Sequence, residues 1–99
     1  MASSFGGQDL DQARVHFDRA VSSAPEFFAT RVEMARTWAV ATRNRAVFDD
    51  QLAVVLHSDA GVLPEVEPEQ RAMQARARDL QAQADALFTP RVPPPDPED

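Results

Sequence analysis

The chain has no cysteine, lysine, isoleucine or tyrosine among its 99 residues. Without cysteine it can form no disulfide, thiolate nucleophile or cysteine-based zinc site, and it has no lipobox for lipid attachment. A cysteine-free chain is compatible with either the cytoplasm or the periplasm. The first residues, Met1–Gly7, contain no basic region and no apolar stretch, so they do not form a signal peptide. No apolar run approaches the roughly 20 residues of a membrane span, so we expect no direct membrane insertion.

Large apolar residues are also scarce. Hydrophobic residues make up 43% of the chain, but 17 of the 99 residues are alanine, which is too small to fill a core. This composition favours thin layers of helices over a deep internal pocket, and the length allows one small domain. We therefore expect oligomerisation to help build any larger cavity. The net charge of −6, from ten arginines against sixteen acids, argues against nucleic acid as a partner.

Four amphipathic helices are predicted between residues 9 and 88. The first spans residues 10–24 and ends at Pro25, and the second spans residues 27–42. The first carries a single apolar stripe, formed by Leu10, Ala13, Phe17, Ala20 and Ala24. Asn44 is a suitable N-cap for a third helix at residues 45–57, which Gly61 can end in the left-handed conformation. The fourth and longest begins near residue 67, with Pro68 in its first turn. Its apolar seam is formed by Met73, Ala77, Leu80, Ala84 and Leu87, and Glu67 and Arg71 lie at the spacing of an ion pair within a helix. The fold class is therefore all-α, in helical hairpins.

Residues 89–99 contain five prolines and three acids. Such a segment cannot form a helix or a core, so a disordered Pro-rich acidic tail is predicted there. The expected organisation is a flexible N-terminus at residues 1–8, a helical domain at 9–88 and the tail at 89–99.

Chemical motifs are largely missing. His16 and His57 lie on different predicted helices, and His57 with Asp59 has no third ligand at metal-binding spacing. The neighbouring acids Asp49 and Asp50 point about 100° apart on a helix, so they do not converge on a substrate. We therefore expect no enzyme activity, no cofactor and no metal site.

The first predicted helix resembles part of a tetratricopeptide (TPR) repeat. Ala13, Phe17 and Ala20, followed by Pro25, match the second helix of such a repeat, and residues 28–59 form a degenerate further repeat. Alanine-rich helices also produce these spacings by chance, so both interpretations stay open on the pattern alone.

Short helix-packing patterns follow one another in a defined order along residues 6–88. They are Gly6-Gly7, Ala13-Arg14-x-His16-Phe17-x-Arg19-Ala20, Val32-x-x-Ala35-Arg36-x-Trp38-Ala39, Phe48-x-x-x-Leu52-x-x-Val55-Leu56, Leu63-Pro64, Ala77-Arg78-x-Leu80 and Asp85-Ala86-Leu87-Phe88. This order resembles the C-terminal portion of the T component of TRAP transporters, the TatT-like lipoproteins.

The resemblance implies a periplasmic, lipid-anchored, TPR-like protein that assembles as a trimer. It also implies a pore or cleft for a hydrophobic or organic-acid-like ligand, and a role beside the solute-binding component of a TRAP system. Family members are longer and carry a lipidation cysteine and a signal peptide. Where they have an apolar residue and an asparagine entering the last helix, this chain has Glu67-Pro68-Glu69-Gln70.

The second predicted helix carries the candidate ligand-binding residues. The first helix of a TPR repeat lines the concave surface of the array, and an arginine beside an aromatic ring suits an organic carboxylate. The candidates are Arg31, Met34, Arg36, Trp38 and Arg43. In the alternative interpretation, Met34 and Trp38 are core residues and the arginines are surface residues.

Two functional hypotheses follow. In the first, the chain is a TRAP T-component-like protein or fragment, a non-catalytic accessory that forms a homo-oligomer and binds a ligand or the solute-binding protein. In the second, it is a stand-alone TPR-like protein-interaction module. The first places it in the periplasm as part of a lipid-anchored protein, and the second places it in the cytoplasm if the chain is complete as written. A third, that the chain is a remnant without function, also stays open.

Overall fold

The computed structural model describes residues 7–89, and every regular element within them is a helix. In chain order the elements are α1 (Gly7–Ser23), α2 (Phe28–Glu33), the π-helix η1 (Met34–Ala39), α3 (Arg45–His57), the 3-10 helices η2 (Ala60–Val62) and η3 (Pro64–Val66), α4 (Glu67–Ala82) and α5 (Ala84–Phe88). The predicted all-α fold is confirmed. Helix α1 begins at Gly7, inside the segment predicted to be flexible. Residues 1–6 and the predicted Pro-rich tail from residue 90 lie outside the described residues.

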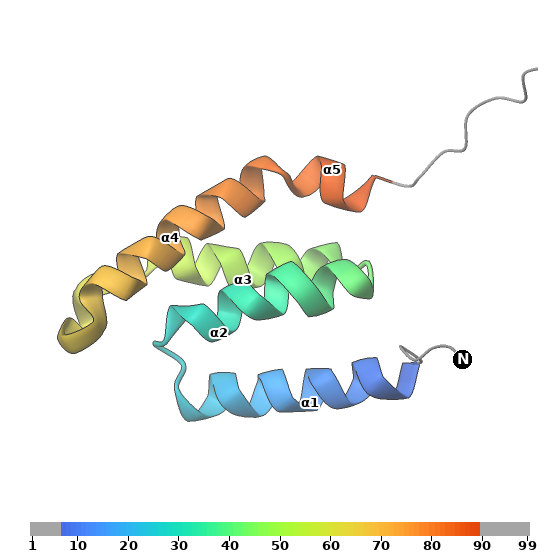
Figure 1. The fold of residues 1–99 in the computed structure, drawn as a ribbon, viewed down its shortest axis with the longest axis horizontal. Coiled ribbons are helices and arrows are strands. Elements are labelled where there is room, and N and C mark those ends of the chain that lie inside the picture. The colour runs from blue at the N-terminus through green and yellow to red at the C-terminus, as the bar shows by residue number, and fades with distance from the viewer. Residues whose placement is uncertain (1–6, 90–99) are drawn as a thin grey trace, which may run out of the picture.

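Successive long helices run antiparallel (Figure 1). Helices α2 and η1 form one continuous second helix, which pairs with α3 in a central hairpin. Helix α4 packs against both α2 and α3, whereas α1 packs against α2 and η1 on the other side. The buried apolar residues of this central hairpin and of α4, with one alanine each from η2 and α5, form one core: Phe28, Val32, Met34, Ala35, Trp38, Ala39, Phe48, Leu52, Val55, Ala60, Ala77, Leu80 and Ala84.

The second helix contains the unpredicted π-helical segment η1. Two threonine hydroxyls donate to carbonyl oxygens of this helix, from Thr37 to Glu33 at 2.6 Å and from Thr42 to Trp38 at 2.9 Å. Such side-chain bonds compete with the regular helix ladder and are a known cause of local distortion. Because a π-helix has more residues per turn than an α-helix, η1 changes the direction in which the side chains after it project.

Arg43 ends this helix in the left-handed conformation, with φ of 58°. Its backbone N–H donates to the Val40 carbonyl at 3.1 Å, and the N–H of Asn44 donates to the Ala39 carbonyl at 2.7 Å. This is the Schellman arrangement, in which glycine is the usual residue because a side chain is strained there. The Arg43 side chain makes a compensating contact, because its Nη2 donates to the Phe88 carbonyl at 2.8 Å.

Helix α3 has the predicted bounds, residues 45–57. The predicted N-cap is confirmed, since Asn44 Oδ1 accepts a hydrogen bond from the Val47 N–H at 3.0 Å. The prediction for Gly61 is wrong, because no described glycine has a positive φ. Instead, Asp59 Oδ1 accepts from the Gly61 N–H at 2.8 Å and starts the 3-10 helix η2.

Helix α4 begins at Glu67 as predicted, with Pro68 in its first turn. Gln70, two residues after Pro68, is only 1% exposed. The Gln70 side chain accepts from the Phe28 N–H at 2.9 Å and donates to the Glu26 carbonyl at 2.7 Å. A single buried amide therefore satisfies two backbone groups at the start of α2, which would otherwise be left unpaired.

The predicted single helix from residue 67 to 87 is interrupted at Gln83, and α5 follows. At 16 residues α4 is also slightly shorter than the 17-residue α1, so it is not the longest helix described. The Phe88 ring packs edge-on against Phe48 at 5.0 Å, beneath the guanidinium of Arg45 at 5.6 Å. Phe88 thus fixes α5 to the start of α3, while Ala84 continues the buried seam of α4.

No helix within residues 7–89 is long and apolar enough to cross a membrane.

Candidate binding groove between α1 and the second helix

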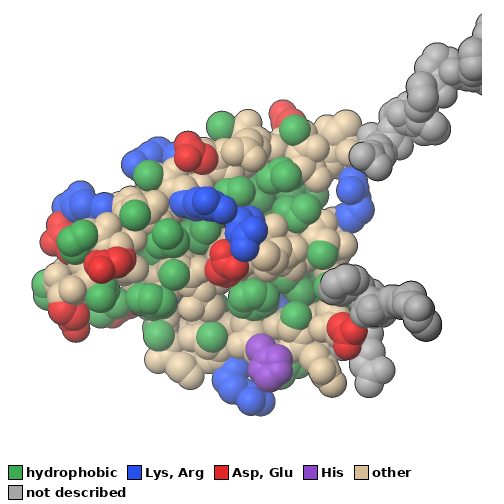
Figure 2. Space-filling model, viewed as in Figure 1, with side chains coloured by type: hydrophobic (Ala, Val, Ile, Leu, Met, Phe, Trp, Pro, Cys, Tyr) green, Lys and Arg blue, Asp and Glu red, His purple; other side chains and the backbone are tan. Residues whose placement is uncertain are grey.

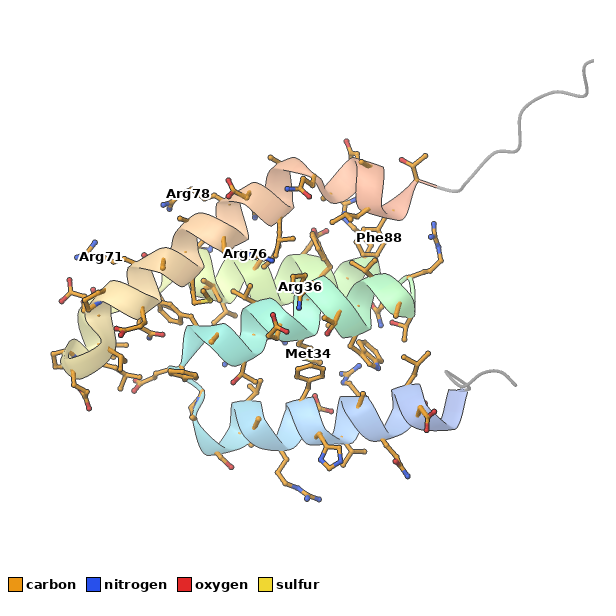
Figure 3. The ribbon with its side chains drawn as sticks, in the orientation of Figure 1. Met34, Arg36, Arg71, Arg76, Arg78 and Phe88 are labelled. Atoms are coloured by element: carbon orange, nitrogen blue, oxygen red, sulfur yellow. The ribbon has the colours of Figure 1, made fainter. Side chains whose placement is uncertain are left out.

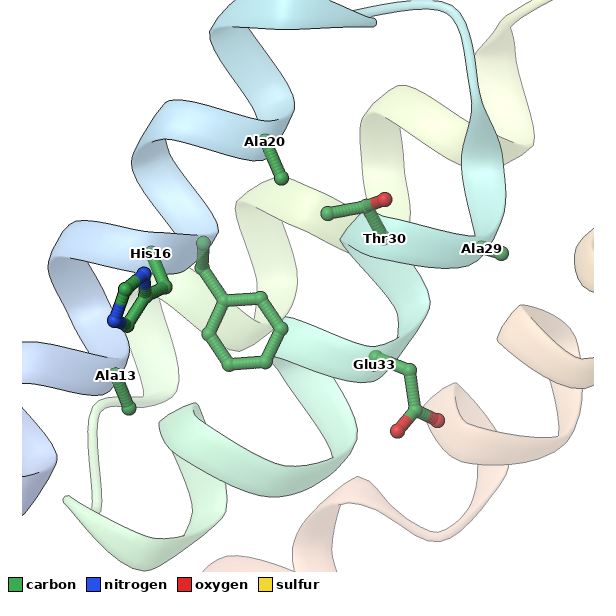
Figure 4. A pocket seen from close by; sticks show the side chains of 7 residues that line it. Ala13, His16, Ala20, Ala29, Thr30 and Glu33 are labelled. Carbon is green, nitrogen blue, oxygen red and sulfur yellow. The ribbon is translucent and has the colours of Figure 1, made fainter.

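A hollow in the described surface lies between α1 and α2. It has a volume of about 540 Å³, is open to solvent and is almost entirely apolar. The residues around it are Ala13, His16, Phe17 and Ala20 from α1, and Ala29, Thr30 and Glu33 from α2 (Figure 4). Ligand pockets in proteins typically measure 300–1,000 Å³, so the hollow is large enough for a small organic molecule.

A second hollow of about 500 Å³ continues along the same pair of helices. It is lined by Leu10, Ala13 and Phe17 from α1 and by Thr37, Trp38 and Ala41 from the second helix. Because Ala13 and Phe17 border both hollows, we treat them as one feature, the α1–α2 groove. Apolar side chains reach the surface between α1 and the rest of the protein on the face shown in Figure 2.

Trp38 holds α1 against the second helix. Its Nε1–H donates to the Leu10 carbonyl at 2.8 Å, and the Arg14 guanidinium lies 4.7 Å from the centre of its ring. Asp18 orients Arg14, since both of its carboxylate oxygens accept from Arg14 Nε at 3.0 Å. These contacts position α1 without burying it, because none of its residues from Asp9 to Ser23 is fully buried.

Glu33 supplies the acidic group at the groove. Arg36 donates to both of its carboxylate oxygens, at 3.0 and 2.8 Å. The hydrogen bond from Arg36 is the main reason that the pKa of Glu33 is lowered; burial acts against it, and the positive charges of Arg36 and Arg76 lower the pKa further. Glu33 is therefore ionised and neutralised by Arg36 at neutral pH, which leaves the groove apolar rather than strongly charged.

The five residues predicted to bind a ligand do not meet at one surface. Met34 is 1% exposed and belongs to the core, as the alternative interpretation had it. Trp38 is largely buried but lines the groove. Arg31 braces the central hairpin, because it donates to the Pro25 carbonyl at 3.1 Å and to Gln51 Oε1 at 2.9 Å. Partial burial there lowers the Arg31 pKa.

The other two arginines lie on separate surfaces. Arg43 binds the end of α5, as described above. Arg36 faces Arg76 across a cleft of about 370 Å³ between η1 and α4, whereas Arg71 and Arg78 point outward from α4 (Figure 3). Asp79 also lines this cleft and Glu33 lies beside it, so the two arginines there are balanced by two acids.

The α1 residues of the groove were predicted only as a packing stripe. The spacing of Leu10, Ala13 and Phe17 correctly indicated a face directed at another helix. It gave no sign that the same face stays partly open, because openness depends on how closely the second helix approaches. Among residues 7–89 no cluster of histidine and acidic side chains could hold a metal ion.

Comparison with models of protein families gives a match. The family model described as TAtT, TRAP transporter T-component, matches residues 1–88. No curated protein and no solved structure matches the chain. Because the match extends over nearly the whole chain, the expectation that it represents only a C-terminal portion of the family is not borne out.

Proposed function

Because the chain belongs to the TRAP transporter T-component family, we propose that it acts as a non-catalytic accessory that binds the apolar part of a ligand during organic-solute uptake. The α1–α2 groove is the proposed binding surface, and the solute-binding component of the same TRAP system is the proposed partner. The observation that carries this proposal is the groove itself, an apolar hollow bordered by Phe17 and Trp38.

The chemistry of the groove supports binding rather than catalysis. Its titratable side chains are His16, which belongs to α1, and Glu33, which is neutralised by Arg36. Within residues 7–89 no hydrogen bond joins His16 or the Glu33 carboxylate to the hydroxyl of Thr30 or Thr37, as activation of a nucleophile would need; the carboxylate accepts from Arg36, and Thr37 donates its hydroxyl hydrogen to the Glu33 carbonyl. Aromatic and aliphatic walls with few polar groups are typical of sites that bind small apolar molecules.

Trp38 provides a direct test, because it is the chain's single tryptophan and no tyrosine contributes emission. We expect the apolar fluorophore N-phenyl-1-naphthylamine to bind and to quench the Trp38 emission. Ala20→Glu introduces a charge into the groove and should weaken this binding at least tenfold. Ala72→Glu makes the same change on the exposed side of α4 and should leave binding within twofold of the unmodified chain.

The partner can be tested with the same two variants. If the groove also contacts the solute-binding component, A20E should lose co-purification with that protein and A72E should keep it. Equal loss of fluorophore binding in A20E and A72E, or no quenching of Trp38, would contradict the groove as the ligand-binding surface.

A further inference from the structure

Apolar surface is left uncovered along the α1–α2 groove. The groove is open to solvent, and Ala20 on its α1 wall is exposed. Among residues 7–89, helices α3 and α4 pack on the other side of the second helix (Figure 1). Neither of them therefore covers the open side of the groove.

The chain continues after α5 into a segment whose chemistry suits this groove. In this Pro-rich segment, residues 90–99, prolines and a valine come first and three acids follow: Pro90-Arg91-Val92-Pro93-Pro94-Pro95-Asp96-Pro97-Glu98-Asp99. Consecutive prolines favour the polyproline II conformation, which binds in aromatic-lined grooves because it loses little entropy on docking. Phe17 and Trp38 are aromatic residues of this kind in the α1–α2 groove.

We propose that the Pro-rich segment docks in the α1–α2 groove of its own chain and competes there with the apolar ligand. The inference rests on the proposed function, because it states how access to the proposed ligand site is regulated. The apolar stretch Val92–Pro95 covers the hollow beside Trp38, and the acids that follow it lie further along α1.

The place where the chain leaves α5 supports docking within one chain. Arg43 Nη2 donates to the Phe88 carbonyl at 2.8 Å and so fixes the point from which the segment starts. Ala41, two residues before Arg43, lines the groove. The end of α5 and the start of α1 also lie at the same end of the molecule (Figure 1). The Pro-rich segment therefore starts close to one end of the groove.

The segment is also long enough to follow the groove. Ten residues in the polyproline II conformation span about 31 Å. The groove extends along the second helix from Ala41 to Ala29, about 18 Å at the rise of a helix. The difference of roughly 13 Å, about four residues, allows the chain to pass around the end of the central hairpin first.

The order of charges favours the same direction. Along α1, the exposed Asp9 precedes the exposed Arg19, and neither forms an ion pair within residues 7–89. Arg19 lies about 60° around α1 from His16, which lines the groove. A segment that enters beside the start of α1 brings Arg91 to Asp9 and its acids to His16 and Arg19. Opposite charges therefore face each other at both ends of the docked segment.

Tethering makes even a weak contact effective. A short connection gives the segment an effective concentration of about 1 mM at the groove, so a contact with a Kd of about 0.1 mM is formed about nine-tenths of the time. A ligand that needs the open groove then binds with an affinity lowered by the open fraction, which is about tenfold.

Fluorophore binding tests the competition in the 99-residue chain. Replacing Pro93, Pro94 and Pro95 together by serine removes apolar contacts and the polyproline II preference. We expect this triple variant to bind N-phenyl-1-naphthylamine at least fivefold more tightly than the unmodified chain.

Charge reversal tests the direction of docking with the same fluorophore. Arg19→Glu should also tighten binding, because it repels the acids of the segment. Adding Asp96→Arg, Glu98→Arg and Asp99→Arg to R19E exchanges the charges and should restore the weaker binding of the unmodified chain. Arg78→Glu, on the outward side of α4 (Figure 3), is the matched control and should leave binding within twofold.

A spin label locates the segment directly. Because the chain has no cysteine, Pro94→Cys creates a single labelling site. In NMR spectra, we expect a nitroxide there to broaden the amide signals of Ala13 and Ala20 strongly, and that of Ala72 on the exposed side of α4 little. Mixing spin-labelled chain with isotope-labelled chain that carries no nitroxide should give no broadening, because the segment docks in its own chain.

The outcomes separate this inference from the proposed function. No broadening at Ala13 and Ala20, or broadening only in the mixed sample, would overturn docking within one chain. Unchanged fluorophore binding in the triple serine variant and in R19E would overturn the competition. Quenching of Trp38 without broadening would overturn the inference and leave the proposed ligand site intact. Broadening without quenching in any variant would overturn the proposed ligand site, and with it the competition, but not the docking.

Discussion

Helices α1 and α4 are nearly equal in length, yet they contribute to the protein in different ways. Helix α4 contacts both helices of the central hairpin and buries Gln70, Ala77 and Leu80. Helix α1 packs on the second helix, and its apolar stripe is partly exposed at Ala20. Helix α4 therefore belongs to the core, whereas part of the apolar surface of α1 stays exposed.

This difference indicates how a small domain can combine stability with binding. A fully buried side chain stabilises the fold but cannot contact a ligand. A partly buried side chain stabilises the fold less, and its exposed part can contact a ligand. The central hairpin with α4 forms the closed part of the protein. Helix α1 forms one wall of the α1–α2 groove, where apolar surface stays uncovered.

Truncating one leucine in each helix should give the largest contrast. Leu80→Ala in α4 removes a buried side chain and should lower the free energy of unfolding by about 2–4 kcal/mol. Leu10→Ala in α1 removes a half-buried one and should cost less than about 1.5 kcal/mol. Urea denaturation of both variants measures the two changes. Equal losses would show that α1 is as much part of the core as α4.

The sequence predicted those features of the fold that depend on neighbours along the chain. The bounds of α3 and the cap at Asn44 follow from local hydrogen bonding, and the α4 seam of Ala77, Leu80 and Ala84 follows from periodicity. The ion pair of Arg71 with Glu67, at 2.6 Å, follows from their spacing of four residues.

Features that depend on distant partners could not be predicted in this way. In the sequence, Gln70 is an ordinary polar residue in the first turn of a helix, and its burial requires the start of α2, more than forty residues earlier. The left-handed Arg43 is held by a contact with Phe88, which is 45 residues away. Similarly, the candidate site was assigned to the second helix alone, because only the three-dimensional packing shows that α1 forms the other wall.

Native-state hydrogen exchange should show a smaller difference between the two helices. We expect α1 amides to exchange by opening of α1 alone, with a weak urea dependence, and α4 amides by global unfolding, with the full dependence. Trp38→Phe removes the hydrogen bond to the Leu10 carbonyl, a contribution of about 1 kcal/mol. It should therefore speed α1 exchange by about fivefold without changing its urea slope. The same strong slope for both helices would contradict separate opening.

The smallest expected effect concerns Glu33, on the groove side of the second helix. Its pKa is lowered chiefly by the hydrogen bond from Arg36, so the pair stabilises the fold above the ordinary glutamate pKa of about 4.3. That contribution disappears as the pH falls through the lowered pKa, because protonated Glu33 no longer attracts Arg36. The Glu33 side chain is 51% exposed, so screening by water limits the contribution to a few tenths of a kcal/mol.

Arg36→Gln should therefore raise the Glu33 pKa in an NMR titration while changing stability by less than about 0.5 kcal/mol at neutral pH. The change should vanish once Glu33 is protonated in both forms. Arg78→Gln, on the outward side of α4 (Figure 3), is the matched control and should leave the Glu33 pKa unchanged. A stability loss as large as that of L80A would mean that the ion pair supports the core. The predicted small loss would instead assign Arg36 to keeping the groove electrically neutral, which favours an apolar ligand over a charged one.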